Sequence, residues 1–179
     1  PKTLEFIGEY AFQNNKIKNL ILPDSIKEIG KWAFQNAKIE ILKLGNNIKT
    51  IGEYAFDSNQ IKELKIPDSL TKIQANTFSE NQIVNLDLGN GVESLGDWCF
   101  QENKIETLIF PKSLKKINFY TFDKNNLIGG LWIPDNVSSI AGYAFTHNPN
   151  LKEVSLNKNT RLGLDIYQIF DKTVNVIKR

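Results

Sequence analysis

The sequence predicts a parallel solenoid of about seven coils, each close to 22 residues long, with a C-terminal cap. Three observations support this fold class. A Phe recurs at spacings of 22, 22, 22, 22, 22 and 23 residues, and other columns keep step with it. A 22-residue unit is too short for a strand–helix–strand unit, which needs about 30 residues. It suits one coil with a strand on one side and a tight return on the other. The recurring residues are Phe12, Phe34, Phe56, Phe78, Phe100, Phe122 and Phe145.

Each coil is expected to add one strand to one parallel sheet. In the first coil this strand contains Leu20, Ile21 and Leu22. Side chains alternate along a strand, so Leu20 and Leu22 face the core and Ile21 faces outward. Pro23 ends the strand because it has no N–H to donate. Equivalent strands of stacked coils would lie about 4.8 Å apart and bury the apolar face that one unit exposes.

Two further repeated positions are expected to shape the turns that connect one strand to the next. Three residues after the Phe stands an Asn, with Ala37 as the one exception, and its amide can satisfy backbone groups of its own and the neighbouring coil. We therefore predict a structural ladder here rather than a row of ligands. The Gly column of Gly30 also holds Gln74, Asn118 and Ala141, which favours tight packing or an ordinary φ over a positive φ.

The repeat also predicts the domain boundaries. Residues 1–156 form the solenoid, and 157–179 form a C-terminal capping segment that keeps apolar residues but loses the Asn column. Pro1 aligns with Pro23, so the chain opens in mid-repeat. Because solenoid ends need capping, we expect further repeats or another domain upstream of Pro1.

Composition and motifs argue against several function classes. The 179 residues include 22 basic and 20 acidic side chains, for a formal charge of +2, with no basic run of the kind that nucleic-acid or membrane-surface binding needs. No apolar run approaches the roughly 18 residues of a membrane span. The single cysteine, Cys99, excludes an intrachain disulfide framework and fits a column of small core residues.

No group of residues suggests catalysis. His147 is the only histidine and lies in a turn, two repeats away from Cys99. The segment at Gly89 and Gly91 lacks the remaining residues of a phosphate-binding loop, and no calcium loop is present. We predict a non-enzymatic protein with no catalytic residue, cofactor or metal site.

The outward strand positions are the candidate binding surface. They vary from coil to coil while the structural columns repeat, although an unconstrained surface would vary in the same way. Large exposed apolar side chains often mark interfaces, which favours binding. The candidate partner-binding residues are Ile21, Ile41, Lys43, Glu63, Lys65, Asp87, Ile109 and Trp132.

A row of aromatic residues stands two positions before each Phe, interrupted only by Asn76. Rings at this spacing are expected to stack on one another along the solenoid. The alternative is a flat aromatic track for sugars or a protein partner. The row consists of Tyr10, Trp32, Tyr54, Trp98, Tyr120 and Tyr143.

The unit reads Ile-x-x-Leu-x-Ile-Pro-x-Ser-Ile-x-x-Ile-Gly-x-x-Ala-Phe-x-x-Asn, and it resembles the BspA-type (Treponema pallidum-type) leucine-rich repeat over residues 1 to about 156. The usual Cys of that family's turn is Asn here. The resemblance implies an α/β-class, right-handed, parallel leucine-rich-repeat solenoid with a concave strand face. It also implies a secreted or bacterial cell-surface location and a role in adhesion or ligand binding.

Together these observations predict a non-enzymatic surface or secreted module that binds a protein or glycan, for instance on a host surface or matrix, through its strand face. A structural spacer or targeting arm of a larger surface protein is one alternative. A carbohydrate-binding platform on the aromatic row is the other.

Overall fold

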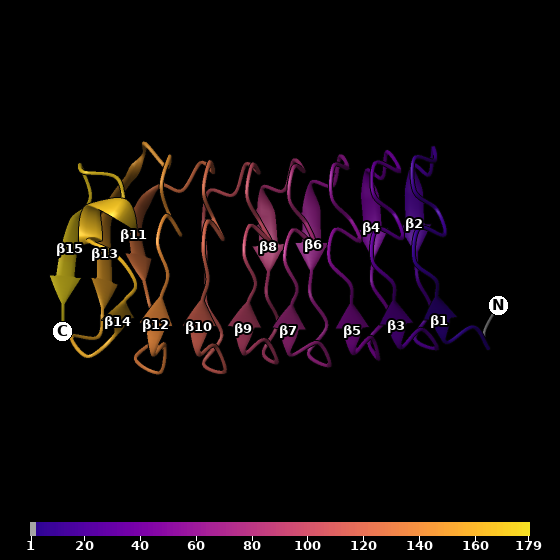
Figure 1. The fold of residues 1–179 in the computed structure, drawn as a ribbon, viewed down its shortest axis with the longest axis horizontal. Helices are drawn as coiled ribbons and strands as arrows, with labels where there is room; N and C mark the ends of the chain where they lie inside the picture. The colour runs from indigo at the N-terminus through magenta and orange to yellow at the C-terminus, as the bar shows by residue number, and fades with distance from the viewer. Residues whose placement is uncertain (1–2) are drawn as a thin grey trace.

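The protein winds into a solenoid of about eight coils in the computed structural model, which describes residues 3–179. Figure 1 shows the coils side by side along the long axis, with the indigo first coil at one end of the stack and the yellow last coil at the other. The repeat period and the parallel stacking predicted from the Phe spacing are therefore confirmed. Pro1 and Lys2, at which the predicted first unit begins, lie outside the described residues.

One row of strands is formed by the aliphatic segment predicted as the strand. Its central residue faces the core and its flanking residues face outward, as in Leu42 between Ile41 and Lys43. The strands pair in parallel as β2–β4, β6–β8 and β11–β13–β15, with Leu20 opposite Leu42. The row consists of β2 (Asn19–Ile21), β4 (Ile41–Lys43), β6 (Glu63–Lys65), β8 (Asn85–Asp87), β11 (Gly129–Trp132), β13 (Leu151–Leu156) and β15 (Asn175–Lys178).

A second row of short strands lies across the core from the first, so the predicted single sheet accounts for only half of the strands (Figure 1). All of these strands except β14 end on a buried aliphatic residue, and they pair in parallel as β1–β3–β5 and β7–β9–β10–β12–β14, with Ile29 opposite Ile51. The row consists of β1 (Phe6–Ile7), β3 (Glu28–Ile29), β5 (Thr50–Ile51), β7 (Lys72–Ile73), β9 (Ser94–Leu95), β10 (Lys116–Ile117), β12 (Ser139–Ile140) and β14 (Arg161–Leu162).

The return between the two rows is built from turns, and the only helix within residues 3–179 is the short 3₁₀ helix η1 (Ile166–Gln168). The α/β label therefore does not suit this chain, because 22 residues that supply two strands and their turns leave no room for a helix. Left-handed backbone closes the turns. Trp32 and Asn36, for example, have φ values of 54° and 51°, and equivalent residues of the other coils match them.

The core is organised around a continuous stack of the recurring Phe rings. Consecutive rings from Phe12 to Phe170 lie 5.1 to 5.7 Å apart between centroids and are nearly parallel. Phe34 and its equivalents are essentially fully buried, whereas Phe12 at the N-terminal end is 42% exposed. Phe170 belongs to residues 157–179, the segment predicted as a cap, which adds β14, η1 and β15 to the stack.

The Asn column forms a buried ladder between coils. The Asn59 Oδ1 accepts a hydrogen bond from the backbone N–H of Ile39 in the preceding coil at 2.9 Å, while its Nδ2 donates to the Phe34 and Phe56 carbonyls. At the exception, Ala37, the backbone carbonyl accepts from the Ile17 N–H at 2.7 Å, and the next residue, Lys38, takes a φ of 60°. A change of turn conformation thus replaces the missing amide.

The Gly column is set by close approach to the preceding coil. A Cβ on Gly52 would lie 2.6 Å from the Lys31 backbone nitrogen, and one on Gly30 would lie 2.5 Å from that of Glu9. Neither glycine has a positive φ. The expectation of tight packing with an ordinary φ is confirmed at these positions.

Candidate binding surface

The outward residues of the first strand row, together with those of the equivalent segment 107–109, form the surface here called the strand face. All eight candidate residues lie on it and are exposed. Their chemical character differs from coil to coil. Register places Ile21 beside Lys43, and Lys65 beside Asp87. The most exposed of the apolar members is Ile109, at 87%.

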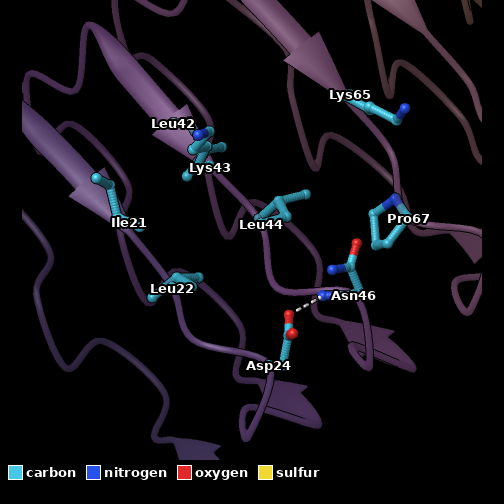
Figure 2. A pocket seen from close by; sticks show the side chains of 9 residues that line it. All are labelled: Ile21, Leu22, Asp24, Leu42, Lys43, Leu44, Asn46, Lys65 and Pro67. Atoms are coloured by element: carbon cyan, nitrogen blue, oxygen red, sulfur yellow. Dashed lines mark hydrogen bonds between the residues drawn. The ribbon is translucent and has the colours of Figure 1, made fainter.

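A groove on the strand face brings Ile21, Lys43 and Lys65 together. Figure 2 shows these side chains around a hollow of about 430 Å³ whose floor contains Leu22 and Leu42. The backbone N–H of Asn46 donates to Asp24 Oδ1 at 2.7 Å and holds one wall in place. This hollow, called the lysine groove below, is lined by Ile21, Leu22, Asp24, Leu42, Lys43, Leu44, Asn46, Lys65 and Pro67.

The two lysines of the groove are available to a ligand. Lys43 makes no ion pair within residues 3–179. Lys65 Nζ lies 3.5 Å from Asp87 Oδ2, but the two side chains are 80% and 58% exposed, and such surface pairs contribute little. The lysine groove therefore combines two exposed lysines, of which Lys43 makes no ion pair within residues 3–179, with the carboxylate of Asp24 and an apolar floor.

Two further hollows continue the strand face. One, of about 510 Å³, lies beside Ile41 and Glu63, and Lys43 lines it as well as the lysine groove. The other, of about 490 Å³, lies between Asp87 and Ile109 and includes Phe110. The predicted residues of coils one to five thus surround a chain of shallow hollows.

The strand row is interrupted at residues 107–109, where the structure has no strand although the sequence pattern is unchanged. The next coil contains one extra residue, and β11 shifts register against β13 between Gly129 and Gly130. The single 23-residue spacing of the Phe column was the sequence signal for this irregularity.

Trp132 contacts Arg179, a residue that the repeat pattern does not place beside it. The Arg179 guanidinium carbon lies 3.3 Å from the centroid of the Trp132 ring. Arg179 also donates to Asp135 Oδ1 at 2.9 Å and to the Ile133 carbonyl at 2.7 Å. One face of Trp132 is therefore covered by the C-terminal coil, and its place on the strand face is apart from the lysine groove.

The aromatic row forms a second stack, outside the Phe stack. Tyr10 and Trp32 lie 4.9 Å apart between centroids, and Tyr120 and Tyr143 lie 4.8 Å apart, with interplanar angles of 5° and 12°. The stack is broken where Asn76 replaces a ring. Because the faces are turned toward one another, a continuous track of open ring faces does not exist along this row.

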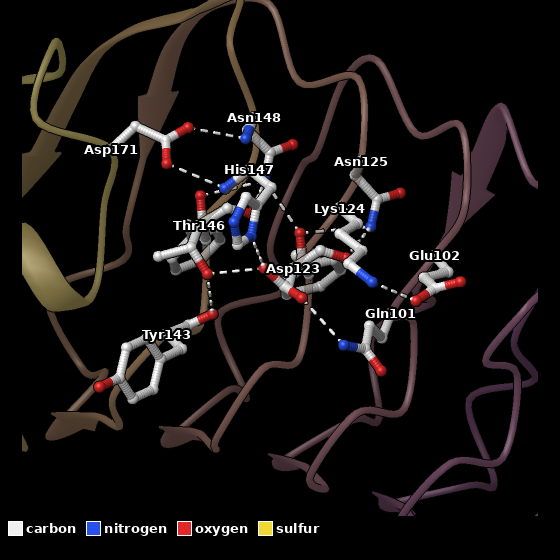
Figure 3. A network of polar contacts seen from close by, with 12 residues as sticks. Gln101, Glu102, Asp123, Lys124, Asn125, Tyr143, Thr146, His147, Asn148 and Asp171 are labelled. Atoms are coloured by element: carbon white, nitrogen blue, oxygen red, sulfur yellow. Dashed lines mark hydrogen bonds and ion pairs between the residues drawn. The ribbon is translucent and has the colours of Figure 1, made fainter.

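The single histidine is exposed and lies against a polar ladder whose central carboxylate, Asp123, is buried (Figure 3). The carboxylate of Asp123 lies 2.6 Å from His147 Nδ1 and accepts from Thr146 Oγ1 at 2.6 Å and from Gln101 Nε2 at 2.9 Å. This resembles part of a catalytic dyad, but an equivalent ladder without a histidine surrounds Asp57, which accepts from a Gln and a Ser of the adjacent coils. The recurrence of the ladder without a histidine favours a structural role for this arrangement.

Cys99 does not complete a catalytic site. Its side chain is fully buried, and this burial raises the pKa of the Cys99 thiol well above its ordinary value. Residues 3–179 contain no cluster of three or more His, Cys, Asp or Glu side chains suited to a metal ion. Within the same residues, no helix is both long enough and apolar enough to cross a bilayer.

The columns that build this surface match a known repeat model. The BspA-type leucine-rich repeat region matches with six copies over residues 1–90 and 50–171. The chain belongs to the BspA-type leucine-rich repeat family. Comparison with curated proteins finds no matching sequence.

Solved structures share the fold of this BspA-type chain. A leucine-rich cell surface protein from Faecalibacterium prausnitzii is 14% identical, with a TM-score of 0.61 over 99% of the chain and 58% of its own length. A leucine-rich repeat protein from Eubacterium ventriosum is 16% identical, with a TM-score of 0.60 over 98% of the chain and 58% of its own length. YopM from Yersinia enterocolitica is 20% identical, with a TM-score of 0.59 over 100% of the chain and 42% of its own length. The chain thus spans little more than half of the length of the first two structures.

Proposed function

We propose that this BspA-type chain is a non-enzymatic binding module that recognises a protein partner through the strand face, with the lysine groove as its principal contact. The observation that carries the proposal is the pairing of Lys43 and Lys65 with an apolar floor and the exposed Ile21 (Figure 2). The leucine-rich-repeat fold is typical of protein-binding surface modules.

The side chains of the groove indicate which chemical groups a partner would present to it. A segment that presents a carboxylate beside an apolar side chain would place the acid between the lysines and bury the apolar group over Leu22 and Leu42. Complementary charge would speed the encounter and fix its register, while apolar burial would supply affinity. We therefore propose an acidic and apolar protein segment as the ligand of this surface.

A cell-surface or secreted location is part of the proposal. It is supported by the BspA-type repeat and by the structural neighbour described as a cell surface protein. In that location the partner would be a protein of a host surface or of the extracellular matrix, and the role would be adhesion.

The experiment compares binding of the purified chain to immobilised matrix proteins and to host cells, before and after charge reversal in the groove. The variant K43E/K65E should bind at least about tenfold more weakly, since repulsion by like charges costs several kcal/mol. Wild-type binding should also weaken as salt is raised.

The matched control is K49E/K72E. It makes the same charge change at two exposed lysines away from the groove, Lys49 just before β5 and Lys72 in β7, and should bind as the wild type does. Equal binding by both double variants would refute the strand-face proposal. Failure of the wild-type chain to bind any member of a broad protein panel would favour the spacer.

A further inference from the structure

We propose that the strand face binds one extended peptide segment of about seven residues, which lies along the solenoid axis across coils one to five. From coil one to coil five the segment reads apolar–x–acidic–x–basic–x–apolar. This inference rests on the function proposed above and deepens it, because it gives the form, the length and the charge order of the partner segment. The lysine groove holds the first half of that segment.

Three hollows of the strand face adjoin one another. Lys43 and Lys65 line both the lysine groove and the next hollow, which has a volume of about 440 Å³. Asp87 and Thr107 line both that hollow and the third, of about 490 Å³, which includes Ile109. Because each hollow shares part of its lining with the next, the three together make one long groove from coil one to coil five.

One column of outward side chains, here called the central column, follows this groove. It consists of Ile21, Lys43, Lys65, Asp87 and Ile109, which occupy the same position in five successive coils. Figure 2 shows the first three of them on neighbouring coils. Among the outward columns of residues 3–179, this is the one that contributes side chains to all three hollows. The order of chemistry along the groove is therefore apolar, basic, basic, acidic and apolar.

The other charged residues of the three hollows lie beside the central column. Asp24 and Lys112 belong to the turns after the strand segments, three residues beyond Ile21 and Ile109. Glu63 lies two residues before Lys65 and belongs to the neighbouring outward column. These groups line the edges of the groove, so the central column sets the charge order for a ligand that lies along the axis.

The spacing of the coils sets the length of the ligand. Neighbouring parallel strands lie about 4.8 Å apart, so Ile21 and Ile109, which are four coils apart, are separated by about 19 Å. Side chains on one side of an extended chain recur at about 6.7 Å, so the first and seventh residues of a segment lie about 20 Å apart. The side chains at positions one, three, five and seven of a heptapeptide therefore face the central column.

Complementarity fixes the chemistry of those four positions. Positions one and seven lie over Ile21 and Ile109, which are 69% and 87% exposed, so both are apolar. Position three falls between Lys43 and Lys65 and is acidic. Position five falls over Asp87, whose Oδ2 lies 3.5 Å from Lys65 Nζ, and is basic. The acid and the base of the ligand thus each meet the opposite charge of this exposed pair.

The experiment titrates isotope-labelled protein with the capped peptide Leu-Ser-Glu-Ser-Lys-Ser-Leu and follows the backbone amides of Lys43 and Ile109 by NMR. Both amides should shift in a saturable way and report the same affinity. The shorter capped peptide Leu-Ser-Glu-Ser fills the lysine groove alone. It should shift Lys43, leave Ile109 unchanged and bind at least about tenfold more weakly than the heptapeptide.

A substitution at the far end of the groove tests the length of the bound segment. I109S removes the apolar contact of position seven, so it should weaken heptapeptide binding by about fivefold or more and leave binding of the shorter peptide unchanged. I177S is the matched control. Ile177 lies opposite Ser155 in the same column, three coils beyond Ile109, and is exposed. This variant should bind both peptides as the wild type does.

A charge swap tests the order of the positions. When the Lys of the heptapeptide is replaced by Glu, the second acid faces Asp87, and the wild-type protein should bind this peptide at least about tenfold more weakly. The variant D87K should reverse the preference between the two heptapeptides. Lys occupies the equivalent position in the two preceding coils, so D87K should fold.

Three results would overturn the inference: no saturable shift with the heptapeptide, shifts at Lys43 alone with the affinity of the shorter peptide, or an unchanged preference in D87K. The second result would leave the lysine groove as a binding site, so the function proposed above would stand without the extended segment. If K43E/K65E binds both peptides as tightly as the wild type does, the lysine groove is not the contact, and the proposed function fails together with this inference.

Discussion

At the scale of the residue, the buried Asn column supplies the pairing that the turn backbone cannot make for itself. Asn103 Oδ1 accepts from the Ile83 N–H at 3.0 Å, and its Nδ2 donates to the Phe78 and Phe100 carbonyls. One amide thus connects three segments of two coils. Its stabilising effect comes from the cost of leaving buried backbone groups unpaired.

Replacing Asn103 with Ala should lower the free energy of unfolding by about 2–4 kcal/mol, because a buried N–H and the carbonyls around it lose their partner. The measurement is chemical denaturation followed by circular dichroism. Asn15 is the matched control: it is exposed and bonds only to the Gln13 carbonyl, so N15A should change stability by less than about 0.5 kcal/mol. Equal losses in both variants would contradict the ladder.

The Cys99 thiol should be unreactive in the folded protein. Burial raises the pKa of this group, so the reactive thiolate is scarce at neutral and mildly alkaline pH. Titration with a chromogenic disulfide reagent at pH 8 should label Cys99 only as fast as the protein unfolds, and fully in guanidinium. Rapid labelling of the native protein would show that the side chain is accessible.

At the scale of the element, the sequence predicted the first strand row and missed the second. Leu20 and Leu22 alternate with the period of a strand, whereas Ile26 and Ile29 are three residues apart and carry no such signal. The second row consists of extended segments of two residues each, which pair in parallel with the equivalent segments of adjacent coils. Residues 107–109 have the same aliphatic pattern but form no strand, beside the coil in which β11 shifts register against β13.

Glycines in two elements should respond oppositely to substitution. A methyl group on Gly52 would lie 2.6 Å from the Lys31 backbone nitrogen, so G52A should cost about 1–3 kcal/mol of stability. Gly130, in β11, has nothing within 4 Å of a Cβ position and no positive φ, so G130A should be neutral or slightly stabilising. Thermal unfolding of the two variants tests this, and similar melting temperatures would contradict it.

The candidate site was predictable only in part, for a physical reason. Exposure of Ile21, Lys43 and Lys65 follows from strand alternation within each coil. Their meeting around one hollow depends on the identical stacking of three coils, which the period also predicts. The contact of Arg179 with Trp132 links residues that share no column, so no periodic argument could reveal it.

At the scale of the whole molecule, each coil contacts mainly its two neighbours, and the Phe stack is the connection that runs through all of them. Such a molecule is nearly one-dimensional, and its stability is approximately a sum of coils and of the interfaces between them. A defect inside the stack should therefore weaken cooperation between the two halves as well as total stability.

Phe78→Ala tests this connection. The ring is fully buried between two others, so its loss should cost about 3–5 kcal/mol. Hydrogen exchange should then show the coils on the two sides of residue 78 opening with different free energies. F12A is the control, because the half-exposed end ring should cost clearly less. Uniform exchange across the chain would indicate that the halves remain coupled.

The unequal ends of the Phe stack have a mechanical consequence. Phe12 has one ring neighbour and is 42% exposed, whereas every ring between Phe34 and Phe145 is held on both sides. Under a stretching force on its two ends, the solenoid should peel from the first coil and release about 22 residues, or roughly 70 Å of contour length, at each step. A chain of this design resists tension as a series of equal links, each of which can refold when the load is removed.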